Sequence, residues 1–225
     1  MPVNKTLQDK INQGRQYRTM QMEIVKRSQE TDGYIVKGYA TTFDEPYLLF
    51  KDGDFEYWEQ IDRNAFAEAK MDDVIFQYDH EGRVFARISN GTLKVMPDNH
   101  GLFIEADLGG TEEGRKLYEE IAGGYTTKMS FGFTISEEEE TRTNENGQTK
   151  YILTIKKIGT LYDVSAVSLP ANDGTEISAR NLINGVIERQ KQADEQAKKE
   201  QEEKERQEQE EMEMRERKRL AALAL

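Results

Sequence analysis

The chain has 225 residues, a formal net charge of −12 and no cysteine. This length suits one domain of ordinary size with an extension. The lack of cysteine excludes disulfides, thiolate zinc sites and cysteine nucleophiles. The acidic balance argues against nucleic-acid binding, which usually needs a basic surface. No apolar run is long enough to span a bilayer, so we expect a protein of a cytoplasm-like space with no membrane partner.

The first part of the chain predicts an extension followed by strands. Residues 1–17 lack the apolar segment of a signal peptide and are interpreted as an N-terminal extension. Residues 17–27 and 33–43 are rich in β-formers, and the polar residues 28–32 between them predict a hairpin. Residues 62–70 predict a short helix capped by Asp62.

The middle of the chain predicts further short strands and one good helix. Strands are expected at residues 72–78, 83–88, 91–96, 101–108, 126–135, 150–158 and 161–169. Thr111 as a cap, Leu117 and Ile121 four residues apart, and a stop at Gly123-Gly124 predict the helix. The polar residues 140–150 are interpreted as a hairpin loop.

Many short strands with few helices favour an α+β or mainly β fold. We expect a closed or partly closed antiparallel β-barrel-like domain over residues 18–185, with a few helices; a sandwich is the alternative.

Residues 186–225 differ from the rest in composition. They contain no Gly, Pro or aromatic residue, and an acidic residue precedes a basic one by four positions six times. No apolar a and d positions occur between Lys198 and Glu211, so a coiled coil is not predicted. The prediction is a charged helical tail whose apolar tip, "RLAALAL", can dock on a partner; a disordered charged tail is the alternative.

The residues that could carry chemistry are few. There is no lysine-bearing phosphate loop and no histidine pair at metal spacing, so neither a cofactor nor a metal is expected. His80, in "YDHEGR", ends a strand-like segment, whereas His100 lies in a turn where a solvated role is natural. Ser130, in "KMSFGF", interrupts an apolar strand, and Gly132 leaves room for a close approach. A lone strand serine is usually only a tolerated small polar residue.

Three stretches in order bear a family resemblance. They are "YDHEGRVFARISNGTLKVMPDNHGLFIEADL", "TEEGRKLYEEIAGGYTTKMSFGF" and "LYDVSAVSLPAN", with "EQIDRNAF" before them. Together they resemble the prohead proteases of tailed phages, which are related in fold to the herpesvirus maturation proteases. The resemblance runs from about Gly38 to about Asn172. The family's usual Asn-His-Asp reads "DHE" here, so Asp79 replaces the asparagine.

The resemblance implies roles for particular residues. It places the catalytic histidine at His80 and the nucleophile at Ser130, and a neutral imidazole is suited to take a serine proton near pH 7. A third group must orient the imidazole. Asp163 matches an acidic position of the family's final strand and is the preferred candidate, with His100, Asp79 and Glu81 as rivals. Backbone amides usually form an oxyanion hole, and Arg83 or Arg87 is a candidate to assist.

The expected function is therefore a serine endopeptidase of the prohead type, with residues 18–185 as the protease domain. By resemblance it works inside the assembling procapsid in the host cytoplasm. There it would cleave scaffold and major capsid proteins and itself, and a homo-oligomer is compatible with this function. The alternative is a catalytically silent protease fold that serves as an assembly or scaffolding module. Self-shortening that disappears on Ser130→Ala separates the two.

Overall fold

The computed structural model describes residues 5–21, 33–145 and 148–168, and in the C-terminal part residues 185, 188, 192, 195, 196, 198–210 and 212. The strands are β1 (Gln16–Gln21), β2 (Ile35–Thr42), β3 (Tyr47–Asp52), β4 (Phe55–Ile61), β5 (Ile75–Tyr78), β6 (Glu81–Arg87), β7 (Leu93–Pro97), β8 (Gly101–Asp107), β9 (Lys128–Glu145) and β10 (Gln148–Val167). The helices are α1 (Lys5–Asn12), α2 (Glu112–Ala122) and the 3₁₀ helix η1 (Ile88–Asn90). This part of the chain is therefore mainly β, as predicted.

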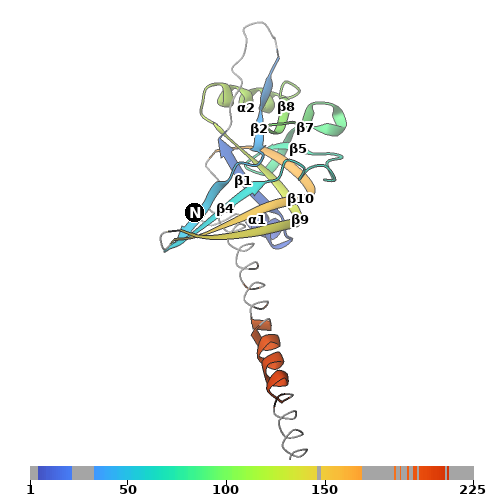
Figure 1. Ribbon diagram of the computed structural model, residues 1–225. Helices are drawn as coiled ribbons and strands as arrows, with labels where there is room; N and C mark the ends of the chain where they lie inside the picture. Colours follow the sequence, from blue (N-terminus) through green and yellow to red (C-terminus); the bar gives the residue numbers. More distant parts are fainter. Residues whose placement is uncertain are drawn as a thin grey trace, which may run out of the picture. The chain divides into compact units, whose positions relative to one another are not determined.

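The strands form two sheets (Figure 1). The larger sheet has the order β1-β9-β10-β4-β3, and β5 pairs with β10 while β6 pairs with β5. The smaller sheet has the order β2-β8-β7. The long strands β9 and β10 lie at the centre of the larger sheet, and β1, β4 and β5 pair with them.

The larger sheet is mixed, which corrects the expectation of an antiparallel arrangement. β10 is antiparallel to β9 but parallel to both β4 and β5. The reason is its length: Thr149–Ile155 pairs with β4, and Asp163–Ala166 pairs with β5. In the described strands these pairings give two separate sheets rather than one closed ring, so the barrel is not found.

One hydrophobic cluster joins the two sheets and α2. Met129, Phe131 and Phe133 of β9 are fully buried and meet residues such as Ile104 of β8 and Ile121 of α2. Burying a side chain of this size contributes about 1.5–3 kcal/mol. Because side chains of a strand alternate between its two faces, the residues between these three on β9 face away from this core.

Helix α2 begins and ends where the sequence predicts. The Thr111 side chain accepts a hydrogen bond from the backbone N–H of Gly114 at 3.0 Å, which caps the first turn. Leu117 and Ile121 are buried on one face. Gly123 follows the last turn, and its N–H donates to the Glu119 carbonyl at 2.8 Å.

Three local predictions are wrong. Residues 62–70 form turns instead of a helix: the N–H groups of Ala65, Ala67 and Ala69 each donate to the carbonyl three residues earlier, and the N–H of Lys70 donates to the carbonyl of Gly159 on β10 at 2.9 Å. β1 and β2 form no hairpin, because β1 pairs with β9 and β2 with β8; residues 28–32 lie outside the described part. The polar residues 140–145 and 148–150 extend β9 and β10: residues 143–145 pair with 148–150, and residues 140–142 pair with 151–153.

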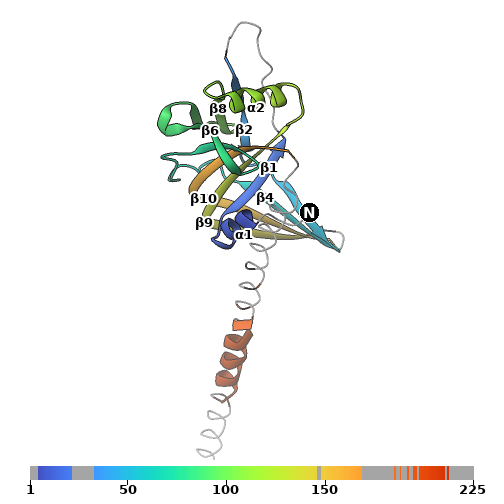
Figure 2. The same ribbon diagram turned by 180° about the vertical axis from the view of Figure 1, so that it is seen from behind.

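The N-terminal segment belongs to the larger sheet. The sequence predicts an extension over residues 1–17, yet α1 leads into β1 (Figure 2). Ile11 and Tyr17 of this segment are buried. The chain divides into the units Met1–Ala179 and Arg180–Leu225. The domain boundaries at residues 18 and 185 stay predictions.

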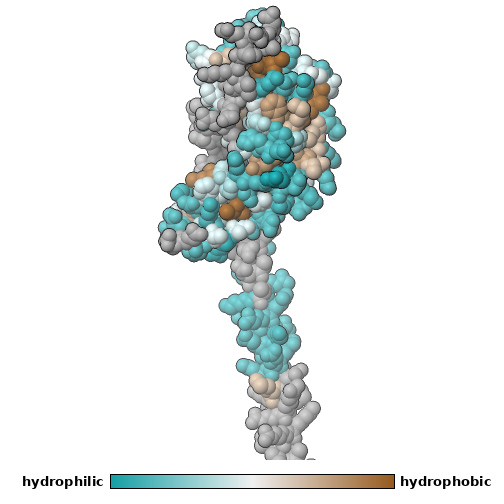
Figure 3. Space-filling model, turned by 45° about the horizontal axis from the view of Figure 1, so that its top comes forward, coloured by the Kyte–Doolittle hydropathy of each residue, from teal (hydrophilic) through white to brown (hydrophobic). Residues whose placement is uncertain are grey.

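The described part of the second unit is polar. Residues 198–210 are helical and exposed, and they are hydrophilic in Figure 3. Ion pairs include Lys198–Glu202 and Arg206–Glu210, in which the basic residue comes first. The apolar tip at residues 219–225 lies outside the described residues. No helix among the described residues has the length and apolar character needed to cross a bilayer.

Candidate active site

Ser130 and Asp163 share one face of the larger sheet. On β9, Met129 and Phe131 point into the core, so Ser130 between them points to the opposite face. On β10, Asp163 pairs with Gly132, and Ser165 pairs with Ser130. Cross-strand neighbours lie on the same face. Because side chains alternate between the two faces of each strand, the Ser130 hydroxyl and the Asp163 carboxylate lie close together on one face.

His80 reaches this face from a tight turn. Tyr78 of β5 pairs with Glu81 of β6, so Asp79 and His80 are the two loop residues of a β-hairpin. Both have positive φ, 50° and 60°, as type I′ turns require. Because β5 runs parallel to β10, with Tyr78 opposite Ala166, the turn lies beside the end of β10.

The three predicted residues form a hydrogen-bonded chain. His80 Nε2 lies 2.6 Å from Ser130 Oγ, and His80 Nδ1 lies 2.5 Å from Asp163 Oδ1. All three side chains are buried, with exposed fractions of 0 % for Ser130, 2 % for His80 and 1 % for Asp163. The arrangement can move a proton from a serine hydroxyl to an imidazole.

The surroundings of Asp163 favour its ionised form. Burial opposes ionisation, but the His80 imidazole, the Ser165 hydroxyl and the Arg15 guanidinium together lower the pKa of Asp163 below its ordinary value. Ser165 Oγ donates to Asp163 Oδ1 at 3.0 Å, and Arg15 Nη1 lies 3.8 Å from Oδ2. An ionised carboxylate only accepts hydrogen bonds, so His80 Nδ1 carries a proton and Nε2 is free to accept one from Ser130. Sequence reasoning missed Ser165 and Arg15, although Ser165 two residues after Asp163 on a strand is a readable signal.

The rivals of Asp163 lie elsewhere. His100 is exposed in a turn, with its ring 4.6 Å from that of Tyr39. The Asp79 carboxylate accepts from the backbone N–H and the hydroxyl of Ser168, at 2.9 and 2.8 Å. Glu81 begins β6. Of these candidates, Asp163 has the contact with His80 Nδ1.

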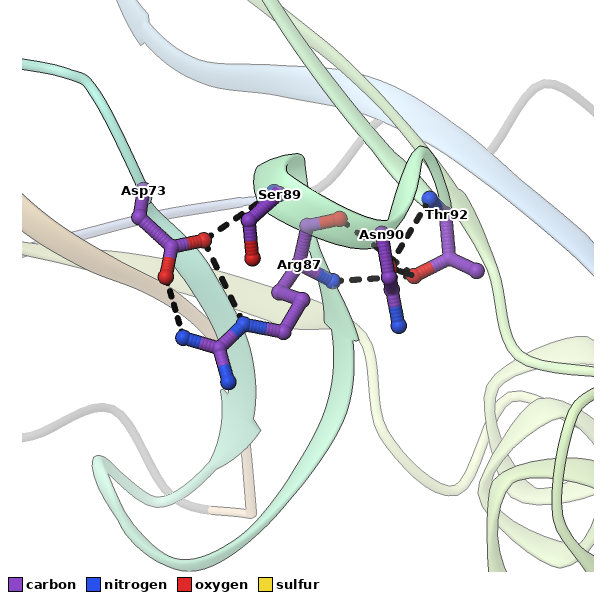
Figure 4. A network of polar contacts seen from close by, with 5 residues as sticks. All are labelled: Asp73, Arg87, Ser89, Asn90 and Thr92. Atoms are coloured by element: carbon purple, nitrogen blue, oxygen red, sulfur yellow. Dashed lines mark hydrogen bonds and ion pairs between the residues drawn. The ribbon is translucent and has the colours of Figure 1, made fainter.

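The two candidate arginines bind carboxylates. Arg83 Nη1 lies 2.9 Å from Glu113, and Arg87 binds both oxygens of Asp73 in an exposed network (Figure 4). The hydrogen bond from Arg87, together with one from the backbone N–H of Ser89, lowers the pKa of Asp73 to about 2. These contacts direct both guanidinium groups to their own partners, and neither is assigned to an oxyanion hole.

The described residues include no group of three or more His, Asp or Glu side chains suited to a metal ion. The chemistry of the site is that of a hydroxyl, an imidazole and a carboxylate, which requires no metal.

Comparison with known proteins identifies the family. A search of curated proteins found no match. The solved structure of the bacteriophage T4 capsid assembly protease, gp21, is 12 % identical over 69 % of this chain and 99 % of that chain, with a TM-score of 0.37. That likeness is too distant to carry an argument. The family model described as caudovirus prohead serine protease matches residues 22–189, about three quarters of the chain. The chain therefore belongs to the caudovirus prohead serine protease family.

Proposed function

We propose that this chain is a serine endopeptidase in which Ser130 is the nucleophile, His80 the general base and Asp163 the group that orients His80. The observation that carries the proposal is the continuous chain of short contacts from Ser130 Oγ through both nitrogens of His80 to Asp163 Oδ1. Family membership supports the reaction class.

The first half of the reaction cleaves the peptide bond. His80 Nε2 takes the proton of Ser130 as Oγ attacks the carbonyl carbon of the substrate, and a tetrahedral oxyanion forms. The imidazolium then gives this proton to the leaving nitrogen, the C–N bond breaks, and an acyl-serine remains. Asp163 stays ionised throughout and stabilises the cationic form of His80.

The second half regenerates the enzyme. A water molecule loses a proton to His80 Nε2 and attacks the acyl carbonyl carbon. The C–O bond to Ser130 breaks, and the proton returns from His80 to Ser130 Oγ. Each proton that leaves one group arrives at another, so the cycle needs no cofactor.

The substrates proposed are capsid-assembly proteins. A prohead protease acts during capsid maturation, so scaffold protein, major capsid protein and this chain itself are the expected targets, inside the procapsid of an infected host. The charged tail is proposed to recruit the enzyme to scaffold or shell. Membership of the prohead protease family supports these targets, and of the three, self-cleavage can be tested with the purified chain alone.

Self-processing is the direct test. Purified protein is incubated at neutral pH, and mass spectrometry follows its shortening. We expect slow shortening in the wild type, because Ser130 and His80 are both buried in this state, and none in Ser130→Ala or His80→Ala. Ser136→Ala, a Ser-to-Ala change at an exposed position of the same strand, is the matched control and should process normally. Undiminished shortening of the Ser130→Ala protein would refute the nucleophile, and no shortening of the wild type would favour a silent, scaffold-like role.

A further inference from the structure

The candidate nucleophile is covered by a segment of its own chain. Ser130 has no exposed surface and His80 has 2 %, so a peptide carbonyl cannot reach Ser130 Oγ in this state. The residues that contact the site from outside the hydrogen-bonded chain include three from the segment that contains α1 and β1: Lys10, Arg15 and Tyr17. We call residues Lys5–Gln21 the N-terminal strap.

The strap touches the site at successive points. Lys10 Nζ donates to the backbone carbonyl of His80 at 2.8 Å. Arg15 Nη1 lies 3.8 Å from Asp163 Oδ2. The Tyr17 ring meets the His80 ring edge-on, with 4.5 Å between centroids. One continuous segment thus contacts the backbone and the imidazole ring of His80 and the carboxylate of Asp163.

The strap also lies along the strand that carries the nucleophile. β1 pairs with β9 over six residues, with Thr19 opposite Ser130 and Tyr17 opposite Gly132. A Cβ added to Gly132 would lie 2.9 Å from Tyr17 Cε1, which shows how closely Tyr17 packs over β9. Gly132 therefore lets the strap sit directly above the site.

The strand of the strap lies at an edge of the larger sheet. β1 is an edge strand with β9 as its strand neighbour. The family model begins at residue 22, so the strap lies before the segment that defines the family. An edge strand can leave without breaking the pairing of β9 with β10.

We infer that the N-terminal strap is an autoinhibitory element: it holds the enzyme latent, and its release from β9 opens Ser130 to substrate. This inference rests on the proposed function. It concerns only access, because the contacts between Ser130, His80 and Asp163 are already made beneath the strap.

A reversible lock tests the inference. Gln21 and Lys128 are paired across β1 and β9, and cross-strand pairs of this kind have the spacing that a disulfide needs. Because the chain has no cysteine, Gln21→Cys with Lys128→Cys forms one defined bond. A fluorophosphonate probe measures access to Ser130, because the oxygen of an activated serine attacks its phosphorus and fluoride leaves. We expect labelling at least tenfold slower in the oxidised than in the reduced protein.

Two further arms make the test decisive. Lys94→Cys with Glu105→Cys locks a pair between β7 and β8 and should label equally in both redox states. Lys10→Ala with Tyr17→Ala loosens the strap and should label at least tenfold faster than wild type, with melting showing that the protein stays folded. Equal labelling of Ser130 in the locked, reduced and loosened proteins would overturn the inference. No labelling in any folded protein would instead refute the nucleophile, and the inference with it.

Discussion

Asp79 is suited to the tight turn that carries His80. Asp79 and His80 both adopt positive φ, a conformation that Asn, Asp and His tolerate better than most residues. The Asp79 carboxylate accepts two hydrogen bonds from Ser168, and its N–H donates to the carbonyl of Ala166. The turn is thereby fastened to the end of β10. Asp79 thus positions His80 through the backbone and does not touch its ring nitrogens.

Substituting Asp79 separates these two contributions. Asp79→Ala loses the hydrogen bonds to Ser168. It also puts alanine, which has no side-chain hydrogen bond to offset the strain, at a positive φ. We therefore expect a loss of about 1–2 kcal/mol in unfolding free energy. Asp79→Gly loses the same hydrogen bonds but tolerates the φ value, and should lose less. Urea unfolding of the two variants provides the comparison. Equal stability of Asp79→Ala and wild type would show that the turn does not depend on this residue.

Asp163 should matter for rate more than for folding. Asp163→Asn keeps the shape, but its amide can donate to His80 Nδ1 and so favours the tautomer that protonates Nε2. In enzymes with a Ser-His-Asp triad the same change costs roughly 10⁴-fold in rate. We expect a loss of that order in self-processing with near-normal melting, and Ser165→Ala as the control should cost far less. Retention of full activity in Asp163→Asn would remove it from the mechanism.

The same carboxylate gives a pH dependence with a definite sign. The pKa of Asp163 is lower in the folded chain than its ordinary value of 3.8, so the folded state favours the ionised form. The contribution of Asp163 to stability is therefore complete when the pH is above its ordinary pKa. It is lost as the pH falls through the lower pKa of the folded state. The stability of the Asp163→Asn protein should accordingly depend less on pH below about 4.

At the scale of elements, β1 is anchored by a buried ion pair. Arg18 Nε and Nη2 donate to the two carboxylate oxygens of Glu59 on β4, at 2.5 and 2.6 Å. Their side chains are 1 % and 0 % exposed, and Tyr47 donates a further hydrogen bond to Glu59. Lifting the strap would leave Glu59 buried without its guanidinium partner. The covered site is therefore expected to be the resting state.

Breaking one half of this pair should be worse than removing both. Arg18→Met leaves the Glu59 charge uncompensated, and we expect a loss of about 3–5 kcal/mol in unfolding free energy. Arg18→Met with Glu59→Leu removes both charges and should recover much of that loss. Chemical denaturation of the two single variants and the double variant measures the coupling. Additive effects of the single changes would mean that the pair does not act as a unit.

Sequence patterns predict some of these elements and not others, for physical reasons. The helix at residues 111–124 carries its own cap, its own apolar stripe and its own stop, so local chemistry is sufficient. The turns at residues 62–70 make backbone hydrogen bonds to a distant strand, from Lys70 N–H to the Gly159 carbonyl and from Ile158 N–H to the Ala65 carbonyl. The parallel pairing of β4 and β5 with β10 likewise depends on long-range contacts. Such partners cannot be read from the segment itself.

The part of the candidate site that lies in recognisable motifs could be predicted from the sequence. His80, Ser130 and Asp163 lie in motifs that resemble a family, and the structure brings the three together. Arg15 and Tyr17 lie in a segment that carries no such motif, and their contacts depend on β1 joining β9. The covering of the site therefore became visible only with the fold.

At the scale of the whole molecule, the charge and the core are distributed unequally along the chain. The hydrophobic cluster draws its members from residues 36–166, whereas the described residues of the tail are exposed. The described residues of the tail make polar contacts with one another four positions apart, such as Gln196 with Glu200 and Gln201 with Glu205. The tail is therefore expected to be a recruitment element that the catalytic unit does not need for folding.

Deletion of residues 186–225 tests this division. The described residues of the tail are exposed, so we expect the melting temperature to change by less than about 2 °C. Incorporation into procapsids should fall severalfold, because the tip at residues 219–225 is the tail's main apolar surface for a partner. Leu220→Ser with Leu225→Ser is the matched variant and should lower incorporation while leaving the charged part intact. Differential scanning calorimetry and quantitative blotting of purified procapsids measure the two effects. A large drop in melting temperature with normal incorporation would show that the tail stabilises the catalytic unit and does not recruit it.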